Sequence, residues 1–198
     1  MGSAGERAIE SLREAVLADP ENSAFRALGY APVFTAHPDA RLAVIGQAPG
    51  RRAQASHVPF DDASGARLRG WLGIDEATFR GPAVALVPMD FFYPGRGPGG
   101  DLPPRPGIAA RWHPPLLALM PGIRLTLLVG SYAQAHYLGA RRRGSLTETV
   151  RASADYLPEF MPLVHPSPLN FRWHARNPWF EADVVPELRE RVREILAD

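Results

Sequence analysis

The amino-acid sequence predicts a three-layer α/β/α fold around a short, mostly parallel four-stranded sheet. Four short apolar runs have the length and composition of buried strands, and segments with helical spacing of apolar residues alternate with them. That alternation is typical of a parallel sheet with helices on both faces. With 198 residues and 45% hydrophobic side chains, the chain is long enough for one such domain, which we expect to span residues 1–198.

The strands are predicted where branched and apolar residues run almost unbroken toward a glycine or a proline. Parallel strands have this composition because helices cover both of their faces, so that neither face needs polar side chains. The four predicted strands cover residues 41–46, 82–89, 123–131 and 160–168.

The helices are predicted from a periodicity near 3.6 residues together with start and stop signals. Ser64 is expected to cap a helix that ends near Gly73, and Pro121 with Gly122 is expected to stop the helix before the third strand. The predicted helices cover residues 6–19, 64–74, 116–122, 132–138 and 183–198.

One segment, residues 93–107 ("YPGRGPGGDLPPRPG"), is dominated by glycine and proline. Its composition excludes a helix or a central strand. A disordered linker is one interpretation. Because the segment follows a predicted strand in mid-domain, we expect it instead to form a wall of a binding site at the carboxyl edge of the sheet.

Composition excludes several classes of protein. The absence of cysteine rules out disulfides, thiolate nucleophiles and cysteine-ligated metal clusters. The sequence contains no apolar run of the ~20 residues that a membrane span needs and no signal peptide near its start, so we expect a cytoplasmic protein without membrane contact. Net charge is +1 and every basic residue is arginine, which fits a GC-rich genome; local arginine clusters remain possible phosphate contacts.

Polar residues follow each predicted strand, at the point where the strand ends. They are Gln47 in "GQAPG", Asp90 in "PMDFF", Ser131 in "GSYAQ" and His165 in "HPSPLN". Because the carboxyl ends of parallel strands meet at one edge of a sheet, we expect these side chains to converge there on an active site.

Other common sites lack their sequence signals. The chain has no lysine and hence no phosphate-binding loop, no G-x-G-x-x-G dinucleotide motif and no G-x-S-x-G hydrolase elbow. Its six histidines show no close metal-ligand spacing. We therefore expect neither a metal nor a cofactor.

Three segments resemble the motifs of the uracil-DNA glycosylase superfamily, in the order in which that family has them. They are "VIGQAPG" (residues 44–50), "VPFDDASGARL" (residues 58–68) and "HPSPLN" (residues 165–170), and the likeness spans about residues 40–180. The resemblance implies hydrolysis of the N-glycosidic bond of uracil, or a related deaminated base, in DNA by base flipping. It places the protein in base excision repair, acting on DNA as a monomer without a cofactor.

The resemblance also implies roles for residues at these motifs. His165 would donate a hydrogen bond to O2 of the flipped uracil and stabilise the anion that forms there. Phe60 would stack on the base, and the turn with Gln47 and Ala48 would approach the pyrimidine and the attacking water. The residues after the histidine would bind DNA, with a phosphate contact and a wedge that replaces the extruded base; they are Ser167, Leu169 and Asn170.

The chain departs from the family pattern at the groups that carry catalysis. The best-known branch has G-Q-D-P-Y in its first motif, whereas this chain has Ala48 and Gly50 at the aspartate and the tyrosine. The family's uracil-reading asparagine is absent, and Asp90 lies nearby. Asp62 is the favoured water-positioning carboxylate, because another branch uses an aspartate after the aromatic residue. Asp90 is its rival, and Asp62 has the alternative role of capping the following helix.

These departures leave alternatives of different classes. The chain could be a catalytically silent DNA-binding protein that keeps the fold and the wedge. It could instead hydrolyse free nucleosides or small glycosides, in which case deoxyuridine would react at least as well as DNA. An activity test on uracil-containing DNA separates the three.

Overall fold

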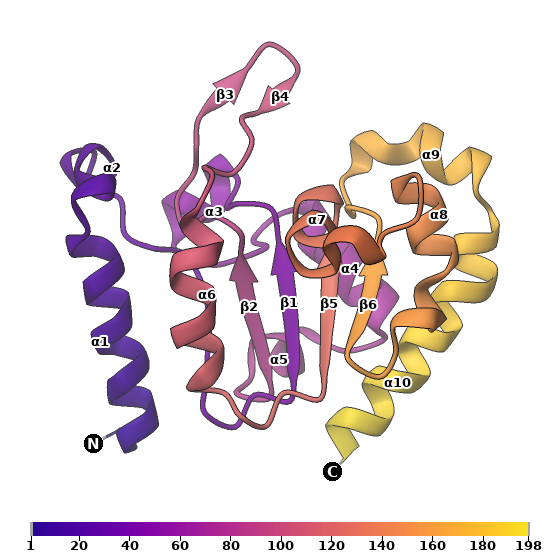
Figure 1. Ribbon diagram of the computed structural model, residues 1–198, viewed down its shortest axis with the longest axis horizontal. Coiled ribbons are helices and arrows are strands. Elements are labelled where there is room, and N and C mark those ends of the chain that lie inside the picture. The colour runs from indigo at the N-terminus through magenta and orange to yellow at the C-terminus, as the bar shows by residue number, and fades with distance from the viewer. Residues whose placement is uncertain (1, 198) are drawn as a thin grey trace.

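The computed structural model describes residues 2–197 and has a four-stranded parallel sheet at its centre (Figure 1). The strands lie in the order β2-β1-β5-β6. The chain passes from β1 to β2 on one side of β1, and then adds β5 and β6 on the other side. Ligands bind at such a switch in open sheets, beyond the carboxyl ends of the strands. The strands are β1 (Leu42–Gly46), β2 (Val84–Pro88), β5 (Leu125–Val129) and β6 (Phe160–Leu163).

Helices cover both faces of the sheet and complete a three-layer α/β/α fold. Side chains alternate across a strand, so in β1 Leu42 and Val44 pack with α4, α5, α8 and α10, whereas Ile45 packs with α1, α6 and α7. The helices are α1 (Ala4–Ala18), α2 (Ser23–Ala27), α3 (Arg51–Ser56), α4 (Ala63–Leu72), α5 (Glu76–Arg80), α6 (Ile108–Ala118), α7 (Ser131–Leu138), α8 (Leu146–Arg151), α9 (Phe171–Arg176) and α10 (Val185–Ala197).

The segment rich in glycine and proline forms a small hairpin of its own. Two-residue strands β3 (Arg96–Gly97) and β4 (Gly100–Asp101) pair antiparallel, and the hairpin projects beyond the carboxyl ends of the sheet (Figure 1). The prediction that this segment holds neither a helix nor a central strand is confirmed. The hairpin itself was not predicted from the sequence.

The predicted strands and longer helices are confirmed with shifted ends. The fourth strand stops at Leu163, which leaves His165 in the loop beyond it. The helix expected at 116–122 is wrong in extent: α6 begins at Ile108 and continues through Pro114 and Pro115, because its apolar side packs on the core despite two missing amide donors. The predicted C-terminal helix extends to residue 198, which lies outside the described residues.

Two further points correct the sequence analysis. The N-cap of α4 is Asp62 rather than Ser64, since the Asp62 carboxylate accepts the amide of Gly65 at 3.0 Å. Five helices of five or six residues were not predicted, because one or two turns show too little periodicity to detect; they are α2, α3, α5, α8 and α9. Within residues 2–197, no helix is long and apolar enough to span a membrane.

Candidate functional site

A cavity of about 510 Å³ lies at the carboxyl ends of β1 and β2. Four separate parts of the chain supply most of its lining: residues 46–50, 59–64, 99–102 and 165–170. Of the described residues that line it, only Asp62 and Asp101 carry a charge, and none is an arginine. The two carboxylates disfavour an anionic group such as a phosphate in the interior.

The structure brings eight of the nine predicted site residues to this cavity. They are Gln47, Ala48, Phe60, Asp62, His165, Ser167, Leu169 and Asn170. Asp90 is the exception. Ser131, also expected at this edge, borders a separate cavity of about 370 Å³ with Arg142 and Arg143.

His165 is held in one tautomer by its own loop. The backbone N–H of Ser167 donates to Nδ1 of His165 at 3.2 Å, so the proton of the neutral ring sits on Nε2. Burial lowers the pKa of His165, and the negative charge of Asp62 offsets part of that effect. The ring is therefore neutral at pH 7 with its proton on Nε2, and His165 is among the residues that line the cavity.

The loop that carries His165 is braced by short hydrogen bonds. The Asn170 side-chain amide donates to the carbonyl oxygen of His165 at 2.7 Å, and the Leu169 N–H donates to Oγ of Ser167 at 3.2 Å. Pro166 and Pro168 restrict the backbone between these bonds. On this stiff loop the side chain of Leu169 is 81% exposed.

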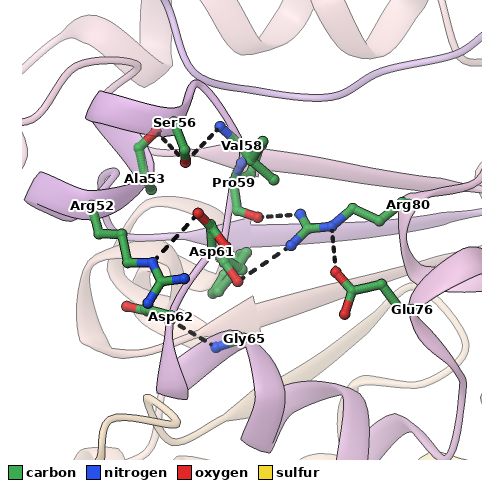
Figure 2. A network of polar contacts seen from close by, with 11 residues as sticks. Arg52, Ala53, Ser56, Val58, Pro59, Asp61, Asp62, Gly65, Glu76 and Arg80 are labelled. Atoms are coloured by element: carbon green, nitrogen blue, oxygen red, sulfur yellow. Dashed lines mark hydrogen bonds and ion pairs between the residues drawn. The ribbon is translucent and has the colours of Figure 1, made fainter.

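Phe60 is placed by a constrained backbone. Its φ of 54° lies in the left-handed region, which costs of order 1–3 kcal/mol for a residue other than glycine. The first turn of α4 holds this conformation, since a Cβ on Gly65 would lie 1.9 Å from the Phe60 carbonyl oxygen. Arg80 donates to the carbonyl oxygen of Pro59 (Figure 2). It also donates to the carbonyl oxygen of Phe60, at 3.5 Å. The Phe60 ring packs edge-on against Phe79 and borders the cavity.

The adjacent carboxylates Asp61 and Asp62 have different surroundings (Figure 2). Asp61 pairs with Arg52 at 3.5 Å, and the Ser56 hydroxyl and Arg52 lower its pKa. Asp62 points to the start of α4, where one carboxylate oxygen accepts the Gly65 amide, and it also lines the cavity. Asp62 can therefore cap α4 and line the cavity at the same time. Asp61 instead forms an ion pair with Arg52.

Asp90 has a structural setting that the sequence analysis did not predict. Its carboxylate is fully buried and accepts two hydrogen bonds from the Arg105 guanidinium, at 2.7 and 2.8 Å. It also accepts the backbone amides of Arg105 at 3.1 Å and Phe92 at 3.2 Å. The structure therefore does not bring Asp90 to the cavity, and its oxygens are occupied by protein donors.

The turn after β1 forms the floor of the cavity. Its backbone is tied to the end of β2, because Met89 N–H donates to the Gly46 carbonyl at 2.9 Å and Asp90 N–H donates to that of Gln47 at 3.2 Å. A Cβ on Gly46 would lie 3.0 Å from the Phe60 ring, so glycine lets that ring lie over the strand end. A Cβ on Gly50 would meet only Asp101, at 3.9 Å.

Asp101 lines the cavity and was not predicted from the sequence. It lies on the β3–β4 hairpin, where its carboxylate accepts the Tyr93 hydroxyl at 3.2 Å. The expectation that residues 93–107 form a wall of the site predicted this segment, but it did not single out Asp101. Among residues 2–197, no cluster of three or more histidines and carboxylates has the arrangement of a metal site.

A comparison with known protein families finds a matching family model. The model of the Uracil DNA glycosylase superfamily matches residues 32–189. The matched range includes all four strands of the central sheet and the nine predicted site residues. Helices α1 and α2 precede it.

Proposed function

The chain belongs to the uracil DNA glycosylase superfamily, and from this premise we propose that it removes uracil, or a related deaminated base, from DNA. Members of the superfamily are glycosylases, which hydrolyse the N-glycosidic bond between a base and its deoxyribose. One juxtaposition supports the proposal most directly. A neutral histidine at the cavity of about 510 Å³ and an exposed leucine lie four residues apart on one loop, His165 and Leu169.

In the proposed reaction, the bond between C1′ of deoxyribose and N1 of uracil breaks, and its electron pair leaves with the base. Nε2–H of His165 donates to the base oxygen that becomes negative. Water adds its hydroxyl to C1′, and its remaining proton ends on the base. A preorganised donor of this kind contributes about 10²–10³ in rate, because it is aimed at charge that develops only in the transition state.

The remaining cavity residues have complementary tasks in this proposal. The ring of Phe60 stacks on the flipped base, and the turn with Gln47 and Ala48 meets the edge of the pyrimidine. Asp62 orients the attacking water and offsets positive charge on the sugar. Its placement supports this task better than that of Asp90, whose oxygens already accept four protein hydrogen bonds.

Outside the cavity, the loop after β6 meets the duplex. Leu169 fills the space that the extruded base leaves, Ser167 contacts a neighbouring phosphate, and Asn170 keeps the loop in place through the His165 carbonyl. The exposure of Leu169 favours DNA as substrate over a free nucleoside, because a free nucleoside has no base stack in which this side chain could fill a gap.

Oligonucleotides with one uracil test the proposal. Incubation with the purified protein followed by alkali should cleave the strand at the uracil, while a matched oligonucleotide with thymine should stay intact. DNA binding without cleavage would identify a silent binder. Faster release of uracil from free deoxyuridine than from DNA would identify a nucleoside hydrolase.

A further inference from the structure

One wall of the cavity stands on a hairpin with little structure of its own. We call residues 95–102 the wall hairpin; it has two-residue strands closed by a hydrogen bond from Leu102 N–H to the Gly95 carbonyl at 2.9 Å. Gly99, Gly100, Asp101 and Leu102 line the cavity. A two-stranded ribbon this short is not stable alone. Its position must therefore be set by contacts at its base.

The base of the wall hairpin is fixed through Arg105. The Arg105 guanidinium forms a bidentate pair with the fully buried carboxylate of Asp90 at the end of β2. The Arg105 backbone N–H also donates to that carboxylate, at 3.1 Å. Paired donors of this geometry fix orientation as well as distance.

The outer side of the same guanidinium is covered by a part of the chain that precedes the family match. Its Nη1 donates to the Glu21 carbonyl at 3.1 Å, and its Cζ lies 4.6 Å from the centre of the Phe25 ring. The Phe25 ring in turn stacks on Phe92 at 5.0 Å with an interplanar angle of 8°. We call residues 20–27 the N-terminal brace; the matched residues begin at 32.

We propose that the N-terminal brace positions the wall hairpin, with Phe25 and Arg105 as the positioning residues. The proposal rests on the proposed function in one respect, that the cavity binds the flipped base. With Phe25 and Glu21 in place, the guanidinium is held on three sides, and the hairpin is preorganised before a base enters. Without the ring, Arg105 keeps its carboxylate but loses its support, and the wall moves.

The chain offers a matched control on the same brace. Arg111 of α6 bonds Asp19 at 2.7 Å and Glu21 Oε1 at 2.9 Å, but neither bond involves the hairpin. Arg111→Gln therefore removes two exposed side-chain bonds of the N-terminal segment and keeps both the Phe25 ring and the Glu21 carbonyl that contact Arg105. Phe25→Leu keeps most of the apolar volume and removes the aromatic face. It therefore tests the same contact if Phe25→Ala fails to fold. Phe25→Tyr keeps the face and serves as the rescue variant.

Trypsin cleavage after Arg96, followed by mass spectrometry of the two fragments, reports hairpin opening without any need for activity. We expect Phe25→Ala and Phe25→Leu to be cut there about tenfold faster than the parent, the factor that loss of a cation–π contact implies. Phe25→Tyr and Arg111→Gln should be cut at the parent rate. Cleavage at Arg96 that is no faster in Phe25→Leu than in Arg111→Gln would overturn the proposal.

Kinetics on uracil-containing DNA then link the brace to the cavity. KM should rise severalfold in Phe25→Leu, while the single-turnover rate at saturation stays within about twofold, because the wall binds the base and does not touch the breaking bond. An unchanged KM in a variant that opens faster would refute the link to base binding. A parent that excises no uracil would refute the proposed function alone, since the proteolysis still decides the brace.

Discussion

The backbone N–H of Ser167 donates to Nδ1 of His165 at 3.2 Å, and this one bond assigns the proton of the neutral imidazole to Nε2. Burial keeps the pKa of the ring below its usual value, so the neutral form is the one present at pH 7. In the proposed reaction, the hydrogen bond from this neutral donor would strengthen as the leaving base becomes an anion. The bond is local to "HPSP", which explains why so short a sequence can carry the chemistry.

The two candidate carboxylates should respond differently to removal of charge. Asp62→Asn keeps an effective helix cap, so we expect unchanged stability and a rate about 10² lower, within the range for a lost acid–base group. Asp90→Asn weakens a buried pair with Arg105 and should cost a large part of the ~3–5 kcal/mol seen when such pairs are broken. Urea unfolding and single-turnover excision of both variants measure this. Equal rates in Asp62→Asn and the parent would exclude Asp62 as the water-positioning group.

Leu169→Ala should separate paired from single-stranded substrates. The side chain is 81% exposed, so its truncation should leave the free energy of unfolding almost unchanged. Only a duplex imposes the unstacking cost of a few kcal/mol that a wedge offsets. We expect a loss of roughly tenfold or more on duplex DNA and little loss on single strands. Equal losses on both would mean that Leu169 does not act as a wedge.

Gly50 should leave the cavity open to substituents on the base. Phe91 and Phe92 are buried in the core, and Tyr93, whose hydroxyl bonds Asp101, is not among the described residues that line the cavity. We expect excision of 5-hydroxymethyluracil, uracil still being preferred, and weak activity at most on thymine opposite guanine. A binding pocket discriminates between two substrates that differ by one methyl group by only about 1–3 kcal/mol of transition-state free energy.

Gly50→Tyr is the matching variant, with Gly50→Ala as its control for loss of glycine. A Cβ at this position meets no backbone atom within 4 Å, so neither change should unfold the protein. The tyrosine should suppress excision of 5-hydroxymethyluracil and spare uracil. If the parent protein excludes 5-hydroxymethyluracil as strongly as Gly50→Tyr does, another group must block substituents on this side of the base.

His113 should make stability depend on pH. Its Nε2 bonds the Pro88 carbonyl at 2.9 Å and its Nδ1 bonds the Tyr137 hydroxyl at 2.6 Å, and burial lowers the pKa of His113 to about 4. Between pH 6.5 and 4, His113 therefore binds a proton in the unfolded chain but stays mostly neutral in the folded chain. This contribution to stability is complete above pH 6.5 and declines by about 3 kcal/mol by pH 4.

Urea unfolding at pH 6.5, 5.5 and 4.5 checks this, with His113→Gln as the comparison. The variant will be less stable at pH 6.5, because it loses the paired hydrogen bonds, but its stability should decline less steeply with acid. The difference between the two slopes isolates His113 from carboxylates that titrate in the same range. Identical slopes would contradict the lowered pKa.

The parts of the fold that local sequence determines were predictable. Each sheet strand is an apolar run that ends at a loop, and the topology then brings the loops together, so that Gln47 and His165 could be placed at one edge. Asp62 and Ser64 were both reasonable caps in "DDAS", and only the geometry of the first turn separates them. Helices of one or two turns left no periodic pattern to detect.

Long-range pairing was beyond the sequence. Asp90 seemed a candidate because it follows a strand, and nothing in its neighbourhood shows that Arg105, fifteen residues later, closes over it. The brace at Phe25 depends on contacts between segments about 80 residues apart. Such contacts depend on how layers pack, which periodicity and motif spacing do not encode.

The central claim is that His165 helps this protein release uracil from DNA. The most direct measurement is the amount of free uracil, by mass spectrometry, released from a single-stranded oligonucleotide by the parent, His165→Ala and the control His57→Asn, which changes a histidine in the left-handed cap of α3. We predict release by the parent and by His57→Asn at equal rates, and release about 10²–10³ slower by folded His165→Ala. No uracil from the parent, or near-parent rates from His165→Ala, would contradict the account.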